Sequence, residues 1–156
     1  MAVVQFKLFV PLFLSLCLLV PLIQATKVDY CDKKAGYDVE VSGVKISPYP
    51  VARGQPATFS ISASTGKAIS GGKLVIDVSF FGAHIHSETH DLCKETSCPV
   101  STGDFVISHS QVLPGFTPPG KYTLKMRMED ASKHQLTCIG FDFNIGLSES
   151  KAVADS

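Results

Sequence analysis

The sequence of 156 residues contains no tryptophan and no excess of charge of either sign. It carries 14 basic and 14 acidic side chains, so its formal net charge at pH 7 is zero. Proteins that bind nucleic acid through its phosphates usually present a clustered basic surface. The balanced composition therefore argues against a nucleic-acid partner.

Catalytic motifs are also missing. The chain has neither the G-x-S-x-G turn of α/β-hydrolases nor the glycine-rich P-loop of nucleotide-hydrolysing enzymes. Its cysteines are better explained as disulfide partners than as nucleophiles. The sequence thus predicts a protein that is not an enzyme and needs no cofactor.

The N-terminus is the most apolar part of the chain. Lys7 is the only charge among the first 25 residues, residues 8–23 are apolar, and Ala25 is a small residue suited to the position before a cleavage site. These features predict a signal peptide over residues 1–25 and passage through the secretory pathway. The destination is then the extracellular space, such as an apoplast, or a vacuolar or lysosomal lumen.

Residues 26–156 remain after removal of the leader, with 14 acidic and 13 basic side chains because Lys7 is lost. This length suits one domain with a core of its own. We expect that domain to span residues 26–147. The polar residues 148–156 are expected to form a flexible tail.

Four cysteines follow the leader: Cys31, Cys93, Cys98 and Cys138. An even number of cysteines in an oxidising compartment predicts two disulfides. Four cysteines allow three pairings, and the residues alone do not select one.

Apolar and polar residues alternate along most of the remaining chain. The alternation predicts β-strands near residues 37–46, 57–63, 74–80, 105–107, 122–128 and 139–145. It slips by one residue at Gly43, which predicts a β-bulge there. Proline and glycine punctuate the connections, and no convincing helix interrupts them. The pattern predicts an all-β protein, a two-sheet antiparallel β-sandwich.

Three histidines follow the third predicted strand with the spacing H-x-H-x3-H. His84 and His86 are expected to point to the same side of a strand end, with His90 returning from the next loop. Such a set can bind zinc or copper, and one alternative is a cupin-like metal-dependent enzyme that uses His84 and His86. The match covers half of one cupin motif, so polar surface residues are the simpler interpretation.

The order and spacing of several segments resemble the ML lipid-recognition domains, which include the Niemann-Pick lysosomal cholesterol carrier and the phosphatidylglycerol/phosphatidylinositol transfer proteins. These segments are Cys31, residues 44–48 with Gly54-Gln55, Cys93-x4-Cys98-Pro99, Phe105, Leu113-Pro114, Gly120-Lys121-Tyr122, Met128-Glu129-Asp130 and Cys138. Niemann-Pick carriers have a further cysteine pair near the turn at residues 47–51. Its absence here disfavours a cholesterol-specific member.

The resemblance implies an immunoglobulin-like sandwich with a lipid cavity between its sheets. It also implies the disulfides Cys31–Cys138 and Cys93–Cys98. The implied function is binding and transfer of a lipid, either a phospholipid such as phosphatidylglycerol or phosphatidylinositol or a sterol. The expected partners are the lipid and, transiently, a membrane, and the expected state is a monomer.

The inward-facing apolar residues of the predicted strands, with Phe116 from a loop, are the candidates for the cavity wall. They are Phe59, Ile61, Ile76, Val78, Phe80, Phe105, Ile107, Phe116, Tyr122, Leu124, Met126, Phe141 and Phe143. The apolar loop over residues 113–120 could form a rim that touches a bilayer. Alternatively, the same side chains fill a solid core, and the protein is an extracellular recognition module with a protein partner.

Overall fold

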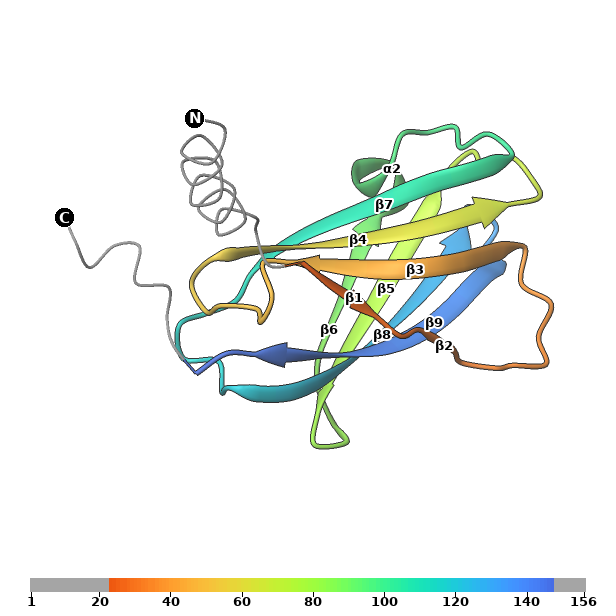
Figure 1. Cartoon of the computed structure of the whole chain (residues 1–156). Helices are drawn as coiled ribbons and strands as arrows, with labels where there is room; N and C mark the ends of the chain where they lie inside the picture. The colour runs from red at the N-terminus through yellow and green to blue at the C-terminus, as the bar shows by residue number, and fades with distance from the viewer. Residues whose placement is uncertain (1–22, 148–156) are drawn as a thin grey trace, which may run out of the picture.

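The computed structural model describes residues 23–147, which form two antiparallel sheets packed face to face (Figure 1). The smaller sheet contains β1 (Gln24–Thr26), β3 (Val39–Ser47), β4 (Pro56–Thr65) and β7 (Gly103–Val112), in this order. The larger sheet contains β2 (Asp29–Tyr30), β9 (Gln135–Ile145), β8 (Gly120–Asp130), β5 (Gly72–Phe80) and β6 (Ala83–Asp91), also in this order. The predicted two-sheet antiparallel sandwich is confirmed.

The predicted signal peptide lies outside the described residues except for Ile23, Gln24 and Ala25, and the predicted tail at 148–156 lies wholly outside them. Gln24 and Ala25 belong to β1, which pairs with β3. No helix among residues 23–147 is long and apolar enough to cross a membrane.

The strand patterns follow from the sequence alternation. In β4, Phe59, Ile61 and Ala63 are buried between the sheets, while Ser60 and Ser62 between them are partly exposed. The register between β3 and β4 shifts between Val41 and Gly43, which confirms the predicted bulge.

Three strands were not predicted: the short strands β1 and β2, and the longer strand β6. Phe81 and Gly82, with φ values of 49° and 78°, form a two-residue turn that sends the chain back along β5 as β6. Positive φ at both central residues is the geometry that matches the twist of a two-residue hairpin. Because β6 is a polar edge strand, it lacks the apolar alternation by which the other strands were predicted.

Both disulfides implied by the family resemblance are formed. Cys31–Cys138 ties the segment after β2 to β9, and Cys93–Cys98 closes the loop that begins with the short helix α2 (Leu92–Glu95). In the loop-entropy model, the bridge across 107 positions stabilises the fold by about 5 kcal/mol and the bridge across five by about 2 kcal/mol.

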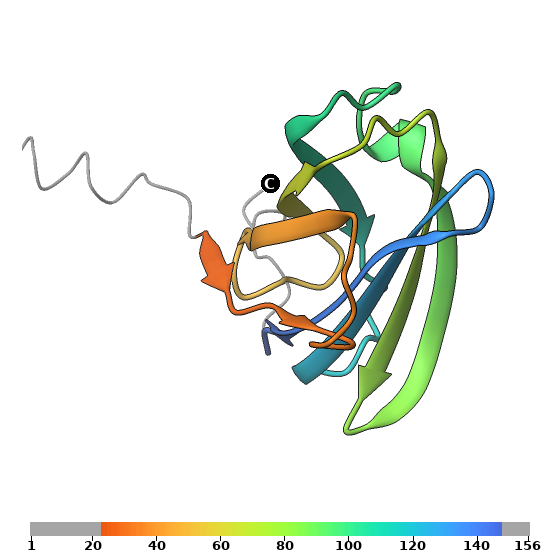
Figure 2. The same cartoon turned by 90° about the vertical axis from the view of Figure 1, so that its right-hand side faces the viewer.

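The two sheets do not pack evenly along their length. Their edge strands β6 and β7 come together where α2 joins them, and they diverge toward the β5–β6 hairpin tip, as Figures 1 and 2 show from two directions. The side chains of the two sheets leave a space between them on this β6–β7 side.

Candidate functional site: a pocket between the sheets

A pocket of about 300 Å³ occupies this space. Apolar side chains from both sheets make most of its wall: Phe59, Ile76, Val78, Ile85, Val112, Tyr122, Leu124, Phe143 and Ile145. Leu113, Pro114 and Thr117 of the β7–β8 loop contribute to it as well. Ile85 and Val112 are each 53% exposed, so the pocket reaches the surface between β6 and β7.

Six of the thirteen residues predicted for a cavity wall lie on the wall of this pocket. They are Phe59, Ile76, Val78, Tyr122, Leu124 and Phe143. Four others are buried in the core and do not line the pocket: Ile61, Ile107, Met126 and Phe141. Phe80 and Phe105 are partly buried and pack against the core.

Phe116 does not face the interior, contrary to the prediction. The amide of Thr117 donates to the carbonyl of Pro114, which makes Gly115 and Phe116 the central residues of a tight turn. The Phe116 side chain is consequently 87% exposed. Strand alternation does not govern such a loop, which is why it could not place this side chain.

Tyr122 fixes the loop that borders the pocket. Its buried ring stacks on Phe80 with 4.5 Å between ring centroids, and its hydroxyl donates to the carbonyl of Pro118 at 2.7 Å. Burial raises the pKa of Tyr122, so the hydroxyl stays protonated as a donor. Gly120, with φ of 135°, lies so close to Phe80 that a side chain there would crowd the ring.

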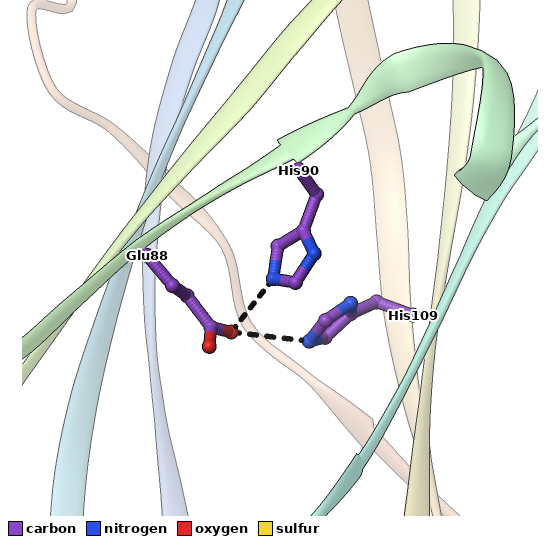
Figure 3. Close-up of side chains that lie close together, drawn as sticks. All are labelled: Glu88, His90 and His109. Atoms are coloured by element: carbon purple, nitrogen blue, oxygen red, sulfur yellow. Dashed lines mark ion pairs between the residues drawn. The ribbon is translucent and has the colours of Figure 1, made fainter.

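Polar groups gather on the β6–β7 side of the pocket. His86, Glu88 and His109 belong to its wall. Glu88 Oε1 lies 3.0 Å from His90 Nε2 and 3.4 Å from His109 Nε2, and the carboxylate points between the two rings (Figure 3). Burial raises the pKa of Glu88, but contacts with His90 and His86 outweigh it and hold that pKa below its usual value.

The three predicted histidines do not form one set. The register of β5 and β6 shifts between Val78 and Ser79, where β6 carries the extra residue Ile85. His84 therefore lies beside Asp77 at 3.4 Å, while His86 lies beside Glu88 at 3.2 Å on the other face of the sheet. The expectation that His84 and His86 point to the same side is wrong. The two side chains therefore cannot form the pair of ligands that a cupin-like metal site would need.

A second hollow, of about 580 Å³, lies on the outside of the larger sheet. The segment from Thr26 to Cys31, which includes the edge strand β2 beside β9, forms one side of this hollow. Lys27, Asp29, Lys125 and Asp142 contribute charges to its wall. It is larger than the inter-sheet pocket, but the four charged side chains on its wall suit the apolar part of a lipid less well.

A family model described as the ML domain matches residues 25–145. The chain belongs to the ML domain family. This ML domain is 32% identical over 117 residues to a putative phosphatidylglycerol/phosphatidylinositol transfer protein of Dictyostelium discoideum, with 72% of the chain and 81% of that protein covered. It is 33% identical over 143 residues to the MD-2-related lipid-recognition protein ROSY1 of Arabidopsis thaliana, with 86% of the chain and 83% of that protein covered.

Among solved structures, a Niemann-Pick type C2 protein from the Japanese carpenter ant has the same fold. The TM-score is 0.53 at 11% sequence identity, and the match covers 81% of this ML domain and 93% of that chain. The sandwich is therefore of the immunoglobulin-like type, as the resemblance implied. The two disulfides of the ML domain fit an extracellular or lumenal compartment.

Two polar residues of the pocket wall, Glu88 and His109, were missed from the sequence, although a signal for His109 existed. Phe105 and Ile107 were expected to face inward, and the same alternation places His109 on the inner face of β7. Glu88 carried no comparable signal, because its strand was not predicted.

Proposed function

We propose that this ML domain binds a lipid and transfers it between membranes, holding the apolar part of the lipid in the inter-sheet pocket. The observation that carries the proposal is the apolar pocket of about 300 Å³ that opens between β6 and β7. Pockets that hold small ligands are mostly apolar, with a few polar groups that fix the ligand's orientation. The names of the relatives from Dictyostelium and Arabidopsis support a lipid as the ligand.

The volume of the pocket in this structure limits the size of the ligand that it can hold. Ligand pockets span roughly 300–1,000 Å³, so this one is at the lower end of that range. One acyl chain or a compact ring system suits such a volume. A whole two-chain phospholipid requires the sheets to separate further on the β6–β7 side, where Ile85 and Val112 already lie at the surface.

Burial of apolar surface drives the binding we propose. Each buried methylene group contributes about 0.8 kcal/mol relative to water. A bilayer offers the lipid a similar gain, so the lipid exchanges between pocket and membrane. This is binding without bond-making, performed by a monomer that contacts membranes transiently.

Two exposed aromatic side chains at the pocket end of the molecule support transient contact with a membrane. Phe81 at the β5–β6 hairpin tip and Phe116 in the β7–β8 loop are 86% and 87% exposed. Phe81 packs on Phe80, which in turn lies against Gly120 at the end of that loop. We name Phe81 and Phe116 the rim phenylalanines.

The test is to fill the pocket and measure lipid uptake. In the Val78→Trp variant, the larger side chain occupies the space between the sheets, and we expect the affinity for a fluorescent phosphatidylglycerol and a fluorescent sterol to fall at least tenfold. The matched control is Val106→Trp, because Val106 is 53% exposed on β7 and does not line the pocket. Equal binding by a folded Val78→Trp variant and the control would contradict the proposal.

A further inference from the structure

A cluster of two carboxylates and two imidazoles joins the edge strands of the two sheets. Glu88 and His90 come from β6, Glu95 from α2 and His109 from β7. One metal-binding atom from each of Glu88, His90 and His109 lies within 4.8 Å of the others (Figure 3). His109 is almost fully buried, with 7% of its side chain exposed.

The spacing of these atoms suits a tetrahedral zinc ion. Zinc binds histidine nitrogen and carboxylate oxygen at about 2.0–2.2 Å, so two ligand atoms of a tetrahedral site lie roughly 3.3 Å apart. Glu88 Oε1 is 3.0 Å from His90 Nε2 and 3.4 Å from His109 Nε2. A zinc ion could enter with small side-chain movements.

Glu95 lies on the opposite side of both rings. Its Oε1 is 3.2 Å from His109 Nδ1, where the two form a hydrogen bond, and 3.7 Å from His90 Nδ1. A carboxylate that accepts the Nδ1 proton leaves Nε2 with a free lone pair, and metal-binding histidines commonly have such a partner. The arrangement directs both Nε2 atoms toward Glu88.

Two further observations indicate that this cluster is suited to a bound cation. His90 Nε2 is buried without a hydrogen-bond partner, because its close approach to Glu88 is poorly aligned for one. Within residues 23–147, the ion pairs of Glu88 and Glu95 are all with histidines: His86, His90 and His109. With neutral imidazoles, both carboxylates in this half-buried cluster lack a positive partner.

We propose that Glu88, His90 and His109 bind a zinc ion, with Glu95 orienting the imidazoles, and that this ion clamps β6 to β7 where the two sheets converge. The three ligands leave a fourth position for water. The site differs from the one expected for His84, His86 and His90, since it uses one of those histidines and takes its other ligands from Glu88 and β7. It stands on side-chain geometry and does not depend on lipid binding.

The test is zinc titration of the chelator-treated full-length mature protein by calorimetry at pH 7.5, with metal analysis of the gel-filtered product. We expect one zinc per chain, and at least tenfold weaker binding for His90→Ala and for the near-isosteric Glu88→Gln. His84→Ala is the matched control, because His84 is on the same hairpin but faces the other side, and it should bind as the wild type does.

Nitrogen-15 NMR of the histidine rings supplies a second readout that does not depend on variants. Zinc should bind Nε2 of both His90 and His109 and leave the proton on Nδ1. The proposal is overturned if the wild type retains no more zinc than Glu88→Gln, if His84→Ala loses zinc as His90→Ala does, or if zinc leaves both Nε2 signals unchanged. In those cases the cluster is an ion-pair network between the sheets.

Discussion

At the scale of single residues, hydrogen bonds from hydroxyl groups lower the pKa values of two carboxyl groups on the larger sheet, Asp77 and Asp142. Ser87 lies opposite Asp77 in the β5–β6 pair and donates from its Oγ to Asp77 Oδ1 at 2.6 Å. This hydrogen bond, more than the nearby His84 and Arg127, holds the pKa of Asp77 below its usual value against the opposing effect of burial. The pKa of Asp142 is lowered in the same way by a hydrogen bond from the Thr123 hydroxyl, and Lys121 lowers it further.

The variant Ser87→Ala should therefore raise the Asp77 pKa toward its ordinary value, as carbon-detected NMR titration would measure. Because the native pKa is depressed, the stability it confers is present above the unfolded-state pKa of about 3.9 and is lost as pH falls through the native value. We expect Ser87→Ala to cost about 1 kcal/mol in urea unfolding at pH 6 and much less near pH 2. The Asp142 pKa is the internal control, and an unchanged Asp77 titration would contradict this assignment.

At the scale of strands and loops, prediction succeeded where one face of a strand is buried and failed elsewhere. β4 and β8 were located because inward apolar residues such as Phe59 and Leu124 alternate with polar ones. β6 was missed because both its faces are largely polar, and Phe116 was misplaced because a tight turn, not strand alternation, orients its side chain. Two polar residues of the pocket wall, His86 and Glu88, lie on that unpredicted strand.

The rim phenylalanines lie in the two loops that we expect to touch a membrane, the β5–β6 turn and the β7–β8 loop. Removing a phenylalanine side chain from water contributes about 1.5–3 kcal/mol. The double variant Phe81→Ser/Phe116→Ser should thus partition into phosphatidylglycerol-containing vesicles at least tenfold less than the wild type and transfer lipid more slowly. Its affinity for a fluorescent lipid in solution should change by less than about twofold, because neither side chain lines the pocket.

Vesicle flotation and a donor–acceptor transfer assay would measure the two effects. Val106→Ser is a suitable control, since Val106 is an exposed apolar residue on the outer side of β7. If the double variant floats and transfers as the control does, another surface meets the membrane.

At the scale of the whole molecule, the sandwich combines a pocket on the β6–β7 side with a disulfide at the opposite, β2–β9 edge of the larger sheet. A pocket removes packing contacts between the sheets. The Cys31–Cys138 bridge joins the N-terminal segment to β9, away from the β6–β7 side where the pocket opens. The fold class was predictable from the strand patterns, and the family resemblance implied both the disulfide pairing and a cavity between the sheets. The volume of the pocket was not predictable, because it depends on how far the two sheets diverge.

The central claim is that a lipid lies between the sheets, and photo-cross-linking tests it most directly. Phosphatidylglycerol with a diazirine on one acyl chain would be loaded onto the protein and irradiated, and the labelled residues would be mapped by peptide mass spectrometry. The account predicts adducts on pocket residues such as Ile76, Val78 and Leu124, competed by unlabelled lipid. Adducts confined to the outer hollow at residues 26–31, or no specific adducts at all, would contradict it.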